Sequence, residues 1–109
     1  MKFTKKEGQY IVNCLEEAME EALDWEQEKD HSDYLNVKNK YEDVCNEDMS
    51  CDYSFSNDEL NIMTSSLIGQ MQYLSKGDSE YISIENLINK IEREQETIKK
   101  ASKTEKIAV

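Results

Sequence analysis

The segment from Asp48 to Glu59, DMSCDYSFSNDE, is the first place where residue types and spacing could support chemistry. Side chains with oxygen atoms recur at alternate positions, and the segment ends on a glutamate. Carboxylate and hydroxyl oxygens at such spacing can surround a calcium ion. The same residues can also start a helix, because serine followed three residues later by glutamate satisfies unpaired backbone amides. The two interpretations predict different chemistry for Glu59.

The helix-start interpretation is favoured by a second copy of the pattern. Thr4 and Glu7 repeat the spacing of Ser56 and Glu59, and a phenylalanine precedes the hydroxyl residue in both places. The segment from Phe3, FTKKEGQYIVNCLEEAMEEA, aligns with FSNDELNIMTSSLIGQMQYL from Phe55, and SDYLNV from Ser32 aligns with SEYISI from Ser79. These matches predict a tandem repeat of a helix–turn–helix unit, with capping boxes at both starts and a third start at Ser83.

The calcium interpretation stays as an alternative. The segment resembles the twelve-residue EF-hand loop, in which alternate positions and the last glutamate bind the ion. The matching positions are Asp48, Ser50, Asp52, Ser54, Ser56 and Glu59. Tyr53 stands where that loop needs glycine for a sharp turn, so the resemblance implies at most a degenerate EF-hand-like calcium-binding pair.

Signals for other chemistry are missing from the sequence. One histidine, His31, and three scattered cysteines, Cys14, Cys45 and Cys51, lack the spacing of a zinc site. No glycine-rich phosphate loop or nucleophile motif is present. We therefore expect no enzyme activity, no catalytic residues, no metal ligands and no cofactor. The odd cysteine count and the lack of a signal peptide predict free thiols in a cytoplasmic protein.

The charge pattern carries the main functional signal. The chain of 109 residues has a formal net charge of −11, which argues against direct binding to nucleic acid or to an anionic membrane. Nine carboxylates and one lysine lie between Glu16 and Asp33. This acidic face is either a solvated surface or a binding surface for a protein with a basic site. Its candidate partner-binding residues are Glu16, Glu17, Glu20, Glu21, Asp24 and Glu28.

The fold expected from these patterns is all-α. The chain has no proline and three glycines, and apolar residues recur at helical spacing. Helices are expected over about 5–28, 37–46 and 57–74, with Gly77 as a terminator of the third, and from Ser83 onward. The expected inward rows are Ile11, Leu15, Ala18, Ala22 and Trp25, widened by Cys14 and Leu23; Val37, Tyr41 and Val44; Leu60, Met63, Leu67, Met71 and Leu74; and Ile84, Leu87, Ile88, Ile91 and Ile98.

These helices should form one small helical bundle over residues 1–98. Its repeat units would be 3–47 and 55–98, followed by a flexible tail, 99–109. Met63, Met71 and Tyr73 could instead line a groove for a partner helix, although rows at helical spacing usually face the core.

The opening MKFTKKE and the acidic amphipathic helix after it resemble small proteins of phages and mobile elements of low-GC Gram-positive bacteria. The resemblance implies an inhibitor of host machinery, such as an anti-CRISPR protein that blocks the nucleic-acid channel of a Cas nuclease. The expected partner is a Cas nuclease or another DNA-binding protein with a basic surface, in the host cytoplasm. The alternative is a structural or regulatory protein that forms a homodimer through its apolar rows.

Overall fold

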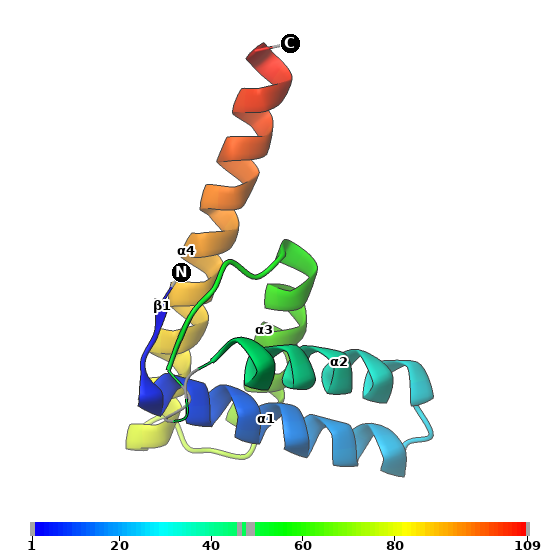
Figure 1. Ribbon diagram of the computed structural model, residues 1–109. Coiled ribbons are helices and arrows are strands. Elements are labelled where there is room, and N and C mark those ends of the chain that lie inside the picture. Colours follow the sequence, from blue (N-terminus) through cyan, green and yellow to red (C-terminus); the bar gives the residue numbers. More distant parts are fainter. Residues whose placement is uncertain (1, 46, 48–49, 109) are drawn as a thin grey trace.

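The computed structural model describes residues 2–45, 47 and 50–108, with side chains described as far as residue 100. Four helices pack against one another: α1 (Lys5–Asp24), α2 (Glu28–Val44), α3 (Asn57–Met71) and α4 (Ser79–Ala108). α1 and α2 form one antiparallel hairpin, α3 and α4 form a second, and the C-terminal part of α4 projects beyond the other helices (Figure 1). The predicted all-α class with four packed helices is confirmed.

Both predicted capping boxes are present. At the start of α1, the Thr4 hydroxyl accepts a hydrogen bond from the Glu7 amide, and the Glu7 carboxylate accepts one from the Thr4 amide. Ser56 and Glu59 form the same pair of bonds at the start of α3. Each box satisfies amides that the first turn of a helix leaves unpaired. Ser56 and Glu59 therefore form the N-terminal cap of α3 in this structure.

A small antiparallel pairing of β1 (Lys2–Phe3) and β2 (Cys51–Asp52) holds these two entrances together. It places Phe3 and Phe55 beside Tyr41 of α2, and all three rings are buried. Tyr41 and Phe55 stack with centroids 5.7 Å apart, and Phe3 lies 5.9 Å from Tyr41. Phe3, Tyr41 and Phe55 therefore form an aromatic cluster within the core. Such aromatic pairs add stability beyond the area that they bury.

The rest of the core comes from the apolar rows. Ile11 and Leu15 of α1 are fully buried, as predicted. The buried residues of the other rows are Val37, Leu60, Met63, Leu67, Ile84, Leu87, Ile88 and Ile91. Met71, Leu74 and Ile98 are partly buried against this cluster. Met63 and Met71 therefore belong to the core, whereas Tyr73 is 71% exposed.

The prediction for the C-terminal end of the first apolar row was wrong. Trp25 and Leu23 were expected inside, but they are 72% and 56% exposed. α1 ends at Asp24 rather than near residue 28, and the chain reverses through Glu26 at φ 56°, a left-handed conformation. The buried row therefore ends at Ala22: Trp25 follows the last residue of the helix, and Leu23, inside α1, lies about 100° around the helix from the buried Ala22.

Three other boundaries differ from expectation. α2 begins at Glu28, nine residues before the predicted start, since its first half has few apolar residues to signal a helix. α3 ends at Met71, so Gly77 does not terminate it. α4 begins at Ser79, with the Asp78 carbonyl accepting from the Ile82 amide at 3.2 Å, so Ser83 is not a cap.

The wider repeat stays a prediction. The two capping boxes match, but the second pair of matched segments occupies different places, because Ser32 lies inside α2 while Ser79 is the first residue of α4. The backbone of α4 is helical through Ala108, within the segment where a flexible tail was expected. Nothing in the structure tests the predicted domain limits.

Candidate partner-binding site

The six predicted partner-binding carboxylates are all exposed. Glu16, Glu17, Glu20, Glu21 and Asp24 lie on α1, on the face opposite Ile11 and Leu15, in agreement with their helical spacing. Glu28 differs, because it belongs to the first turn of α2. A negative charge there stabilises the positive end of the helix dipole, so Glu28 has a structural use of its own.

Few of these carboxylates have partners within the chain. Glu16 forms an ion pair with Lys38 at 3.5 Å, and Lys38 also binds Glu42 at 3.2 Å. Glu21 accepts a hydrogen bond of 3.5 Å from the hydroxyl of Tyr73. Within the described part of the chain, Glu17, Glu20, Asp24 and Glu28 form no ion pair. Four of the six charges are therefore available to a partner.

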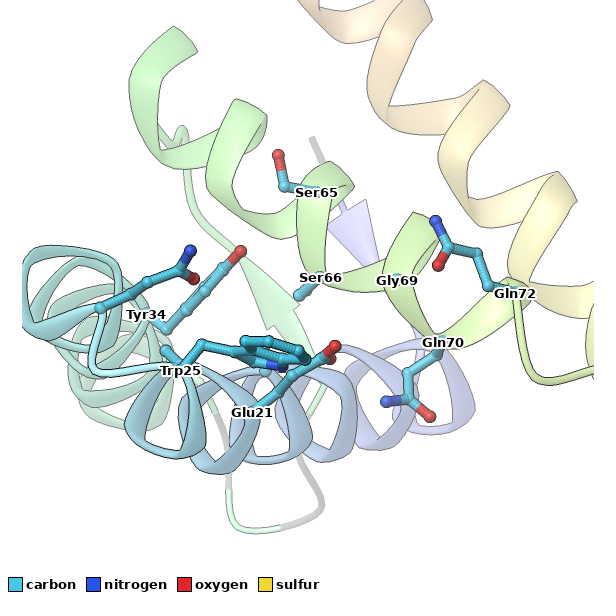
Figure 2. A pocket seen from close by; sticks show the side chains of 11 residues that line it. Glu21, Trp25, Tyr34, Ser65, Ser66, Gly69, Gln70 and Gln72 are labelled. Carbon is cyan, nitrogen blue, oxygen red and sulfur yellow. The ribbon is translucent and has the colours of Figure 1, made fainter.

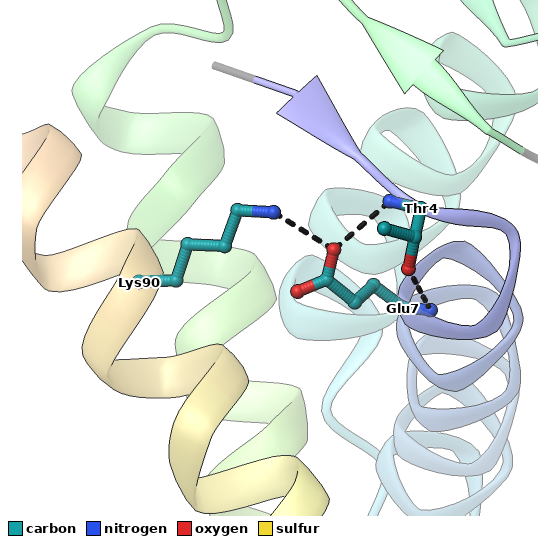
Figure 3. Close-up of polar contacts among 3 residues, drawn as sticks. All are labelled: Thr4, Glu7 and Lys90. Carbon is teal, nitrogen blue, oxygen red and sulfur yellow. Dashed lines mark hydrogen bonds and ion pairs between the residues drawn. The ribbon is translucent and has the colours of Figure 1, made fainter.

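Two other glutamates show how this chain uses a structural carboxylate. Glu7 Oε1 accepts from the Thr4 amide at 2.9 Å and from Lys90 Nζ of α4 at 2.8 Å (Figure 3). Glu59 binds Lys40 of α2 at 2.7 Å while capping α3. Burial by itself would raise the pKa of both carboxyls, but the lysine and the cap hydrogen bonds outweigh it and lower each pKa.

These contacts also bear on the calcium interpretation. The carboxylate of Glu59, the twelfth position of the candidate loop, is engaged by Lys40 and by the Ser56 amide. Asp48, the first position, lies outside the described residues. Among the residues that are described, no three His, Cys, Asp or Glu side chains are grouped to hold a metal ion. The contacts assign Ser56 and Glu59 to the helix cap.

A pocket of about 350 Å³ adjoins the acidic face, between the C-terminal halves of α1 and α3. Figure 2 shows Glu21 and Trp25 at its α1 edge and Tyr34 of α2 beside them. Ser66 is buried, and its hydroxyl donates to the Met63 carbonyl at 2.7 Å. The described residues that line the pocket are Ala18, Glu21, Ala22, Trp25, Gln27, Tyr34, Ser65, Ser66, Gly69, Gln70 and Gln72.

The electrostatics of this pocket are negative. Among the described residues, its lining includes the Glu21 carboxylate and no lysine, arginine or histidine. Burial raises the pKa of the Tyr34 phenol, and the charges of Asp30, Glu21 and Asp33 raise it further. These three carboxylates therefore act on the pocket wall, and an anion there would be repelled.

A second, smaller pocket of about 150 Å³ lies on the other side of Gln70, which lines both. It contains Glu17, Glu80 and the Cys14 thiol. Burial raises the pKa of Cys14 to about 12, with further contributions from Glu17 and Glu80. Cys14 is thus a protonated, unreactive thiol at neutral pH. Neither Cys45 nor Cys51 forms a disulfide, in agreement with the predicted thiols.

The pocket residues were not among the predicted site residues, with the exception of Glu21. Trp25 was expected in the core, and Tyr34 lies in a part of α2 that was not predicted to be helical. An available signal was the position of Trp25 immediately after Asp24, at the end of the acidic segment.

Among the described residues, no helix is both long enough and apolar enough to span a membrane.

Comparison of the chain with protein-family models, with curated protein sequences and with solved structures returned no match.

Proposed function

We propose that this chain is a non-enzymatic protein-binding module that inhibits a host nucleic-acid-handling protein. The carboxylates of α1 occupy a basic site on the partner that otherwise receives nucleic-acid phosphates. The observation that carries the proposal is that Glu17, Glu20 and Asp24 are exposed and form no ion pair within the described part of the chain.

The physical argument rests on the arrangement of like charges. Carboxylates three and four residues apart on one helix face repel and cost a few tenths of a kcal/mol per pair. Glu16, Glu17, Glu20, Glu21 and Asp24 contain several such spacings. A basic groove relieves this repulsion on binding, and its attraction raises the association rate.

The choice of a nucleic-acid-handling partner in the host cytoplasm comes from the resemblance to phage inhibitors. The homodimer alternative is less favoured, because the apolar rows that would form its interface are buried inside the chain. Light scattering after size exclusion tests it directly, and a salt-resistant dimer would favour it.

The test is capture of partners from a Gram-positive bacterial lysate by the tagged protein, with elution by rising salt and identification by mass spectrometry. The acidic-face variant carries Glu17→Gln, Glu20→Gln, Glu21→Gln and Asp24→Asn. The matched control removes four exposed carboxylates elsewhere: Asp43→Asn, Glu85→Gln, Glu92→Gln and Glu96→Gln. Each removes four negative charges from the formal net charge of −11.

A DNA- or RNA-handling protein that salt releases, that the acidic-face variant fails to capture and that the control still captures supports the proposal. Competition by a DNA duplex for the same partner extends it to inhibition. Equal capture by both variants, or partners that resist high salt, would overturn the assignment to the acidic face.

A further inference from the structure

We infer that the pocket between α1 and α3 receives an arginine side chain of the partner protein. This inference deepens the proposed function and rests on it. The pocket includes one edge of the acidic face, since Glu21 belongs to both. Its volume of about 350 Å³ lies at the small end of the range for ligand pockets, which suits a single long side chain.

The lining matches a guanidinium group. Trp25 and Tyr34 supply aromatic rings, and a cation near the face of such a ring is attracted by its quadrupole. Glu21 supplies a carboxylate that can accept two parallel hydrogen bonds from the planar fork of arginine. Lysine carries a compact, strongly hydrated charge and uses both features less well.

The ends of two helices add to this preference. α1 ends at Asp24 and α3 at Met71, and Trp25 and Gln72, the residues that follow them, line the pocket. The C-terminal end of a helix carries a partial negative charge that attracts cations. Neither helix has a basic residue in its last turn, so no side chain of that turn neutralises the partial negative charge.

The aromatic residue is also accessible to a partner. Trp25, the residue after α1, is 72% exposed although its side chain is large and apolar, and Tyr73, which binds Glu21, is 71% exposed. Tryptophan and tyrosine are enriched among the residues that anchor protein–protein interfaces. Glu21, Asp30 and Asp33 make the same surface unsuitable for an anionic ligand.

The first experiment uses peptides of defined charge. Hexa-arginine and hexa-lysine carry the same charge, so a difference between them reports recognition of the guanidinium group. Trp25 is the single tryptophan of the chain, and its fluorescence therefore reports from the pocket. We expect hexa-arginine to change this fluorescence saturably and to bind several-fold more tightly than hexa-lysine.

The second experiment blocks the pocket without changing its charge. A side chain at Gly69 would start in open space, since an added Cβ has no neighbour within 4 Å, so Gly69→Leu places apolar atoms at the wall of the pocket without a clash at Cβ. We expect Gly69→Leu and Glu21→Gln each to weaken hexa-arginine binding about tenfold. Asn39→Leu, on an exposed position of α2, is the matched control and should bind as the wild type.

The outcomes separate the pocket from the acidic face. Equal affinity for the two peptides, or unchanged hexa-arginine binding by Gly69→Leu with a native circular dichroism spectrum, overturns the arginine pocket. If Gly69→Leu also captures the lysate partner as the wild type does, while the acidic-face variant does not, the proposed function stands without the pocket. Loss of capture of the lysate partner by Gly69→Leu, while Asn39→Leu still captures it, supports the inference.

Discussion

The two halves of α1 show how one helix divides structural and exposed roles. From Lys5 to Leu15 it is capped by Thr4, fastened to α4 through Glu7 and Lys90, and buries most of the apolar residues of α1. From Glu16 to Asp24 the one buried residue is Ala22. The first half supplies contacts that hold the fold, and the second half presents charge. Stability and surface chemistry can therefore be altered separately in this helix.

The largest expected difference between the halves is in apolar burial. Leu15 is fully buried and Leu23 is 56% exposed, although they lie on the same helix. We expect Leu15→Ala to lower the free energy of unfolding by about 2–5 kcal/mol, because it loses buried area and leaves a cavity. Leu23→Ala should change it by less than about 0.5 kcal/mol. Urea denaturation followed by circular dichroism measures both, and equal losses would contradict the division.

A smaller effect is expected at the helix entrance. Glu7→Gln weakens the capping box and removes the ion pair with Lys90, so it should cost about 1 kcal/mol at neutral pH. Because the pKa of Glu7 is lowered in the fold, its contribution is complete above the ordinary value of 4.5 and is lost as the pH falls through the folded-state pKa.

Denaturation curves at pH 7 and at pH 3 check this prediction. The difference in unfolding free energy between wild type and Glu7→Gln should shrink at the lower pH. Lys90→Met, which leaves the Thr4 cap intact, separates the ion pair from the box. If the difference in unfolding free energy between wild type and Glu7→Gln is the same at both pH values, the charge of Glu7 does not contribute to stability.

The smallest effect is expected on the acidic face. Glu20 lies three or four residues from Glu16, Glu17 and Asp24, and it has no cation partner in the described part of the chain. Glu20→Gln should therefore raise the unfolding free energy by a few tenths of a kcal/mol at low salt. The gain should vanish at about 1 M salt, where charges are screened within a few ångströms. Destabilisation by Glu20→Gln would assign this carboxylate a structural contact.

Much of the local structure could be predicted because its causes are local. Thr4 with Glu7 and Ser56 with Glu59 each start a helix through contacts three residues apart, so their spacing was sufficient to predict them. The rows through Leu15, Met63 and Leu87 were also predictable, because a helix repeats every 3.6 residues whatever it packs against.

The predictions that were wrong concern features that depend on parts of the chain outside the local sequence pattern. Trp25 continues the apolar spacing of α1, yet the helix ends at Asp24 and Trp25 is exposed next to the chain reversal at Glu26. The first half of α2 has a weak apolar row and no side-chain cap at Gln27, so its helix depends on packing against α1. For the site, the acidic residues could be found from composition, whereas the pocket joins Glu21, Tyr34 and Gly69 from three different helices.

The sequence by itself determined the all-α class, the two capped entrances, the inward rows and the surplus of carboxylates. Those properties follow from residue type and short-range spacing. Only the tertiary structure decided which carboxylates form an ion pair with a lysine. Glu7 pairs with Lys90, and Glu59 pairs with Lys40, in each case from a distant segment. Among the described residues, Glu17 and Glu20 pair with no lysine. The reason is physical, since an ion pair needs two groups within about 4 Å, and only the packing of the helices sets that distance.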